Sequence, residues 1–257
     1  MTGTETTSRG PGLRAWRALI AHEGRMVRRD TAGLVIPLGL PLLLLVMNGN
    51  GDSPPVPGLG GMSQQLAYVL PMVIVLTIAT VGVINMPSFL ATYRRYKILR
   101  RLAVTPARPA MVLVAQAVVG LAQAAAGIVL VVVVAALLFG LSAPADPLGL
   151  ALALTLTTAA MFALGMLVAA VSPTPNAALA IGLVSFFAMM ALGGGFGPRG
   201  NLPDGVAAVG EYLPFGAGLD TLMAAWTGGP LDITQLAALA GVTAVAAAVS
   251  ARLFRWE

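Results

Sequence analysis

The residue types that carry most enzyme chemistry are scarce in this chain of 257 residues. It contains no cysteine, which excludes disulfides, thiolate metal sites and cysteine nucleophiles. His22 is the single histidine, which excludes multi-histidine metal sites, and its position before the first apolar segment disfavours an intramembrane Ser–His protease. Lys97, the single lysine, follows no GxxxxG loop, so the chain has no P-loop for ATP.

The composition is that of an integral membrane protein. Hydrophobic residues make up 58% of the chain, charged residues make up 10%, and the mean hydropathy is +0.88. A soluble domain usually carries about 25% charged residues, so this chain cannot cover a water-facing surface. The net charge of +5 does not indicate a nucleic-acid partner, because the basic residues gather at the ends of apolar segments.

Six apolar segments come close to or exceed the length of about 20 residues that a membrane-spanning helix needs. They run over roughly Thr31–Met47, Leu66–Leu90, Ala110–Leu141, Leu148–Val171, Ala177–Leu192 and Ile233–Phe254. The sequence therefore predicts an all-α membrane protein with six transmembrane helices in a single domain over residues 31–257. Residues 1–12 are rich in Thr, Gly and Ser and are predicted to form a disordered tail.

The basic residues predict the orientation of these spans. Under the six-span model, all of the 15 Lys and Arg residues except Arg199 lie on one side, before span one, between spans two and three, and after span six. Positive charge marks the cytoplasmic side, so both termini are expected in the cytoplasm. Abundant Ala, Gly and Val, with Arg in place of Lys, favour a bacterial plasma membrane as the location.

The stretch Val206–Trp226 is also apolar, but a seventh span here would place Arg252 and Arg255 outside. The stretch also follows a glycine-rich run and contains polar or helix-breaking residues, namely Glu211, Pro214 and Asp220. We therefore expect a helical hairpin over residues 198–227 that dips into the outer leaflet. The two acids fit helix caps, water-facing positions or an outer gate equally well.

Residues 13–30 are predicted to form an amphipathic helix at the membrane interface. Apolar side chains such as Trp16 and Ile20 fall on one arc of the helix, and arginines such as Arg17 and Arg28 fall on the opposite arc, toward lipid phosphates. Glu23 projects onto the apolar face. It is expected either in a local ion pair or in a contact with the transmembrane bundle.

A second amphipathic segment, residues 93–104, follows span two. It ends at a Thr-Pro pair, which favours the start of a new helix at span three. The segment is either a topology signal without a partner or a short cytoplasmic helix on which a soluble protein docks. The candidate docking and coupling residues are Arg94, Arg95, Tyr96, Lys97, Ile98, Leu99, Arg100, Arg101, Leu102, Thr105 and Pro106.

The interior of the predicted bundle is uncharged. No Lys, Arg, Asp or Glu lies in the middle of spans two to five, which disfavours an ion-coupled carrier. The uncharged polar residues either form interhelical hydrogen bonds or line a cargo path. The large apolar residues in span five either contact lipid or the core, or they form a flexible apolar surface for varied cargo. These candidates are Asn85, Gln116, Gln123, Phe186 and Met190.

Two stretches carry a resemblance to a known family. The run Tyr-Arg-Arg-Tyr-Lys-Ile-Leu-Arg-Arg-Leu-Ala-Val-Thr-Pro after span two resembles the docking segment of type-2 ABC exporter permeases, most closely the drug and antibiotic exporters of the daunorubicin-resistance kind. The stretch from Leu202-Pro203 to Tyr212-Leu213-Pro214-Phe215 is similar to that family's pattern between spans five and six. Many members begin the docking segment with acidic residues, where this chain has Tyr93, Arg94 and Arg95.

The resemblance implies a permease that hydrolyses no ATP itself and has no cofactor of its own. Two copies of a separate ATP-binding subunit, carrying ATP and Mg, would attach from the cytoplasm. A second permease copy, most simply in a homodimer, would complete the path for hydrophobic or amphiphilic cargo. In the family, spans one and five form much of the subunit interface, which makes Ala178 and Gly182 candidates for it.

Three alternatives stay open from the sequence. A permease of a glycan or glycolipid exporter has a similar number of spans. A membrane sensor or immunity protein would bind an ATPase or an antibiotic without transport. A stand-alone secondary carrier is the third alternative, although it would leave the basic segment after span two without a role.

Overall fold

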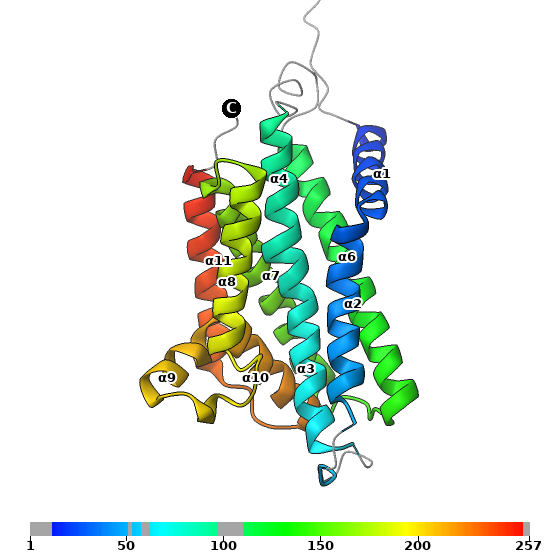
Figure 1. The fold of residues 1–257 in the computed structure, drawn as a ribbon, viewed down its shortest axis with the longest axis vertical. Coiled ribbons are helices and arrows are strands. Elements are labelled where there is room, and N and C mark those ends of the chain that lie inside the picture. Colours follow the sequence, from blue (N-terminus) through cyan, green and yellow to red (C-terminus); the bar gives the residue numbers. More distant parts are fainter. Residues whose placement is uncertain (1–11, 51–52, 58–61, 97–109, 254–257) are drawn as a thin grey trace, which may run out of the picture.

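The computed structural model describes residues 12–50, 53–57, 62–96 and 110–253, and these residues form a helical bundle (Figure 1). This confirms the all-α prediction. The helices are α1 (Leu13–Arg29), α2 (Thr31–Asn48), α3 (Gln64–Ala79), the π-helical turn η1 (Thr80–Asn85), α4 (Met86–Arg95), α6 (Ala110–Phe139), α7 (Pro147–Val171), α8 (Pro175–Leu192), the 3₁₀ turn η2 (Arg199–Asn201), α9 (Asp204–Tyr212), α10 (Pro214–Thr227) and α11 (Ile233–Leu253).

Five of these helical stretches are long and apolar enough to cross a membrane, and a sixth arises if α1 and α2 form one bent span. The bend between α1 and α2 is 62°. It falls at Asp30, whose extended backbone ends α1 and whose carboxylate accepts a hydrogen bond from the Gly33 amide at the start of α2. Figure 1 shows α1 and the end of α11 at one end of the bundle, with α9 at the other.

Span two forms the centre of the bundle. The stretch Gln64–Arg95 runs through α3, η1 and α4 without interruption and is 94% buried in its most apolar part. It packs against α2, α6, α7, α8 and α10. The prediction of a separate helix beginning at residue 93 is therefore wrong in its first residues, because Tyr93–Arg95 continue α4 and Tyr93 is buried. Residues 97–104 lie outside the described residues.

Glycines on two neighbouring helices allow the π-helical turn to approach closely. A Cβ on Gly165 of α7 would overlap the carbonyl oxygen of Gly82, and a Cβ on Gly182 of α8 would lie 2.5 Å from the carbonyl oxygen of Val83. Ala178 on α8 is fully buried as well. Both candidates are therefore buried within the protomer, and Gly182 packs directly against span two, which contradicts the prediction that they lie at a subunit interface.

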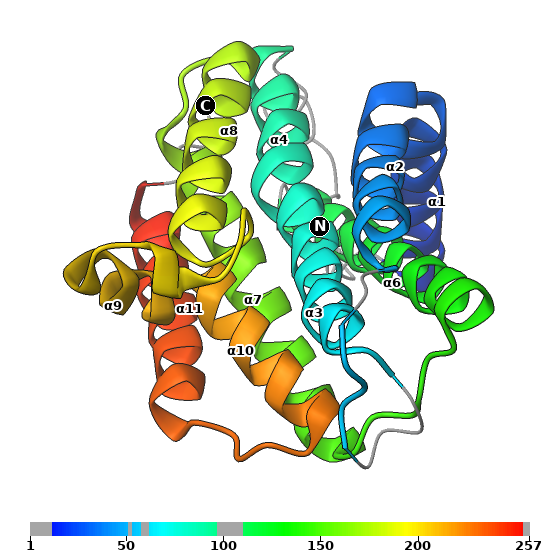
Figure 2. The same ribbon diagram turned by 60° about the horizontal axis from the view of Figure 1, so that its bottom comes forward.

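The segment between spans five and six is a pair of helices, α9 and α10. Figure 2 shows α9 projecting from the bundle and α10 lying along α7. Most of α10 is buried, including Phe215, Leu219, Leu222 and Trp226, and it packs against α3, α7 and α11. Pro214 occupies the first position of α10. The backbone N–H that proline lacks would have no partner within the helix at this position, so the proline does not weaken α10.

Candidate functional site

A cluster of polar side chains joins four elements at the end of the bundle that carries α9. The guanidinium of Arg199, in η2, forms an ion pair with Asp220 on α10. The Nε2 of Gln235, on α11, donates to Asp220 at 2.8 Å and to Glu211 on α9 at 3.4 Å. The side chains of Arg199 and Asp220 are 20% and 22% exposed, so the pair is largely shielded from water. The cluster therefore ties the hairpin to span six.

The same cluster holds the glycine-rich loop after α8, residues 193–197. Arg199 donates to the carbonyl oxygen of Gly193 at 3.3 Å, and the Tyr68 hydroxyl, from α3, donates to the carbonyl oxygen of Gly194. Gly194 has a φ of 97°, a left-handed conformation that glycine adopts without strain. The end of span five is thus fixed to span two on one side and to the hairpin on the other.

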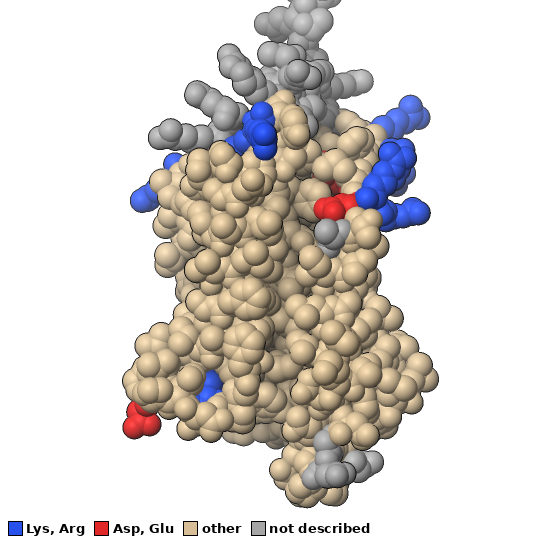
Figure 3. Space-filling view, viewed as in Figure 1, with Lys and Arg blue, Asp and Glu red and all other residues tan. Residues whose placement is uncertain are grey.

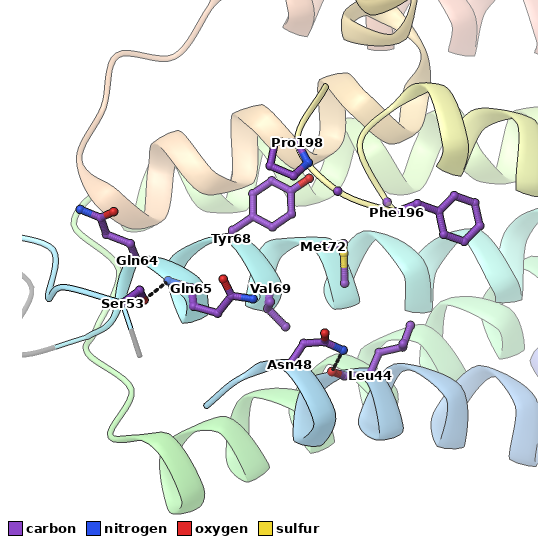
Figure 4. A pocket seen from close by; sticks show the side chains of 12 residues that line it. Leu44, Asn48, Ser53, Gln64, Gln65, Tyr68, Val69, Met72, Phe196 and Pro198 are labelled. Atoms are coloured by element: carbon purple, nitrogen blue, oxygen red, sulfur yellow. Dashed lines mark hydrogen bonds between the residues drawn. The ribbon is translucent and has the colours of Figure 1, made fainter. Parts of the chain in front are cut away.

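A cavity of about 620 Å³ lies between α2, the start of α3 and this glycine-rich loop (Figure 4). Its wall contains amide, hydroxyl, thioether and hydrocarbon groups. The lining residues are Leu44, Asn48, Ser53, Gln64, Gln65, Tyr68, Val69, Met72, Gly195, Phe196, Gly197 and Pro198. No acidic or basic side chain is among them.

Two intramembrane amides share one backbone carbonyl. The Nδ2 of Asn85, at the end of η1, and the Nε2 of Gln123, on α6, each donate to the carbonyl oxygen of Gly33 at 2.6 Å. In an uninterrupted helix this oxygen would accept from the amide of residue 37, but Pro37 has no N–H. The two amides therefore satisfy a carbonyl that the proline leaves open, and they link spans one, two and three.

The other polar candidate within the bundle has a different environment. Gln116, on α6, is 3% exposed, and its Oε1 has no hydrogen-bond partner. Thr157 Oγ1, on α7, is the second such buried atom found among the described residues. The large apolar candidates Phe186 and Met190 lie in the hydrophobic core with exposed fractions of 1% and 6%. Their burial supports the packing interpretation over direct contact with cargo.

At the opposite end of the bundle, α1 is fastened to span two through Glu23. The Tyr93 hydroxyl donates to the Glu23 carboxylate at 2.5 Å, and Glu23 is 2% exposed. Burial raises the pKa of the Glu23 carboxyl above its usual range, and the hydrogen bond from Tyr93 opposes that effect. Of the two expectations for Glu23, the structure shows the contact with the bundle.

Arg94, next to Tyr93, turns to the other side of α4. Its guanidinium donates to the carbonyl oxygens of Ala169, Ala170 and Ser172 at the C-terminal end of α7, with 2.5 Å to Ser172. These carbonyls lack partners within the helix, and a cation suits the negative end of the helix dipole. Arg94 therefore contacts its own bundle rather than standing on the outer face of a docking helix.

The basic side chains gather around this end of the bundle, as Figure 3 shows. On α1, Trp16 and Ile20 are half-buried, whereas Arg17 and Arg28 are exposed. Arg95 and Tyr96 are both exposed at the end of α4. The other candidate docking residues lie outside the described residues: Lys97, Ile98, Leu99, Arg100, Arg101, Leu102, Thr105 and Pro106.

Sequence reasoning did not assign a role to Arg199, Gln235 or Tyr68. The signal for Arg199 was available, because it is the one basic residue on its side of the six-span model. A cation that breaks the sidedness pattern needs a local partner, and Asp220 was already a candidate. Gln235 and Tyr68 gave no comparable signal, since a polar side chain near the end of a span is common.

A family model described as ABC-2 type transporter matches residues 14–226. The match begins in α1 and ends in α10, so it includes the first five spans and the hairpin. No curated protein matches the chain.

Proposed function

Because the chain belongs to the ABC-2 type transporter family, we propose that it is the permease of an exporter that moves hydrophobic or amphiphilic cargo, such as a drug, antibiotic, peptide or lipid, out of the cell. Members of this family are membrane components that work with an ATP-binding subunit and do not hydrolyse ATP themselves. The match over residues 14–226 is the observation that carries the proposal. We place both termini in the cytoplasm, where the basic end of the bundle would face the ATP-binding subunit.

The proposed assembly contains two permease copies and two ATP-binding subunits, which supply ATP and Mg. The segment after α4 docks on the ATP-binding subunit, and Tyr93 and Arg94 are the last anchored points before it. Movement of that segment reaches α1 through the hydrogen bond of Tyr93 to Glu23, and reaches α7 through the contacts of Arg94. These contacts support span two as the element that passes motion from the ATPase to the bundle.

Mild-detergent purification of the chain from its native membrane, with partners identified by mass, tests this function. We expect a stoichiometric soluble protein that carries a Walker motif. An intact, folded chain without such a partner would favour a stand-alone carrier or a sensor instead. A glycan or glycolipid exporter would give the same partner and differ only in cargo.

Reversing the charge of Arg100 and Arg101 together is expected to reduce co-purification of the ATP-binding subunit at least about tenfold, because interface charges steer and hold a complementary partner. The quantity measured is the molar ratio of ATPase to permease after purification. The matched control reverses Arg252 and Arg255, the basic residues near the C-terminal end of span six, and should leave the ratio unchanged. Normal co-purification of the first variant would contradict docking by this segment.

A further inference from the structure

We propose that the cavity between α2, α3 and the glycine-rich loop binds amphiphiles whose polar group is uncharged. This inference rests on the proposed function, and it assigns a chemical class to the cargo. The cavity combines hydrogen-bonding and apolar walls and has a volume of about 620 Å³. Sites of this size suit small organic molecules.

The polar groups of the cavity lie at its outer end. Asn48 is the last residue of α2, and Gln64 and Gln65 are the first residues of α3, so these amides sit where the two helices leave the bundle. Figure 4 shows the Asn48 and Gln65 amides projecting into the space between α2 and α3. The Nδ2 of Asn48 donates a hydrogen bond to the Leu44 carbonyl oxygen at 3.0 Å. The Oδ1 of Asn48 therefore remains available as an acceptor.

The apolar groups of the cavity lie deeper in the bundle. Leu44 is one helical turn below Asn48, and Val69 and Met72 are one and two turns below Gln65. Val69 and Met72 are buried, with exposed fractions of 2% and 7%. A thioether adapts to irregular apolar shapes, so Met72 suits the body of a hydrophobic ligand. Along each of these two helices the wall therefore changes from polar to apolar, in the direction in which an amphiphile lies in a membrane.

The charge of the wall defines the class of polar group. Among the described residues, no Lys, Arg, Asp or Glu lines the cavity, and the ion pair of Arg199 with Asp220 is internally compensated. An ionic group would lose water here without gaining a counter-charge, which is costly. Hydroxyls, amides and sugars, in contrast, find donors and acceptors in the Asn and Gln side chains. Phe196, on the glycine-rich loop, also lines the cavity and is 69% exposed.

The absence of native cysteine allows a direct test on the permease alone. Leu44→Cys places one thiol in the cavity, and its rate of modification by a maleimide is measured in lipid nanodiscs. The probes are octyl β-glucoside, octyl sulfate and octyltrimethylammonium at equal mole fraction in the bilayer. Val184→Cys, on the exposed face of α8, is the control. A change in its rate of modification reports the effect of the probe's partitioning into the lipid.

We expect octyl glucoside to slow modification of Leu44→Cys by about tenfold, and the two charged compounds to slow it less than about twofold. Adding Asn48→Leu and Gln65→Leu to the reporter should remove most of the protection, since each lost hydrogen bond weakens binding severalfold. Equal protection by all three probes, or protection that survives both substitutions, would overturn the proposal.

The exporter function and the binding site in the cavity can be rejected independently of each other. Purification without an ATPase partner would remove the transport function and leave the binding result standing. An ATPase partner together with no selective protection of Leu44→Cys would retain the exporter and remove this cavity as a site for its cargo.

Discussion

Replacing Gly165 by alanine is expected to destabilise the folded chain by about 3 kcal/mol, at the upper end of the usual cost of overpacking a core. A Cβ at this position on α7 would overlap the carbonyl oxygen of Gly82. That oxygen belongs to a backbone turn at the centre of span two, so it cannot rotate away as a flexible side chain would. The substitution therefore forces α7 and η1 apart. The measurement is the thermal denaturation midpoint of the purified chain in detergent.

Gly241→Ala, on α11, is the matched control for this substitution. No atom lies within 4 Å of a Cβ at Gly241, so the same chemical change meets open space. Alanine favours a helix over glycine by up to about 1 kcal/mol, so the control should be neutral or slightly stabilising. Equal midpoints for the two variants would show that α7 and η1 do not make this contact.

The membrane class and five long spans followed from the sequence, because span length and apolar composition are local properties of the chain. The helical stretches Pro147–Val171 and Pro175–Leu192 begin within two residues of the predicted bounds. Proline at the first turn of each helix gives a sharp local start signal. Confirmation of the family rests on the match over residues 14–226 rather than on the short docking motif.

The end of span two could not be located from the pattern. The residues Tyr93, Arg94 and Arg95 fit an amphipathic helix of their own as well as the last turn of a long helix. What decides between them is tertiary: Tyr93 meets Glu23 seventy residues earlier, and Arg94 meets the end of α7. No periodicity within the segment carries that information.

The π-helical turn was also beyond sequence reasoning. Nothing in Thr80–Asn85 alone calls for a wider turn, and its packing depends on glycines in α7 and α8. Pro37 shows the same dependence on distant residues. Its missing N–H can be read from the sequence, but the side-chain amides that donate to the Gly33 carbonyl oxygen come from two other helices. The positions of partners in space decided each of these features.

Replacing Asp220 by alanine is expected to destabilise the chain by about 2 kcal/mol, because Arg199 is then left without a counter-charge. A fully buried pair would cost more, but these side chains are 20% and 22% exposed, so water screens part of the effect. Asp204→Ala, at an exposed position at the start of α9, is the control and should cost no more than about 1 kcal/mol. Denaturation midpoints of the purified variants provide the comparison.

A double-mutant cycle separates the ion pair from the space that Asp220 fills. Arg199→Gln and Asp220→Asn each leave one uncompensated charge, whereas the double variant leaves none, so the double variant should be more stable than the sum of the single losses predicts. Additivity to within about 0.5 kcal/mol would contradict the coupling. Because Arg199 also donates to Gly193, a strong coupling would mean that the hairpin and the end of span five unfold as one unit.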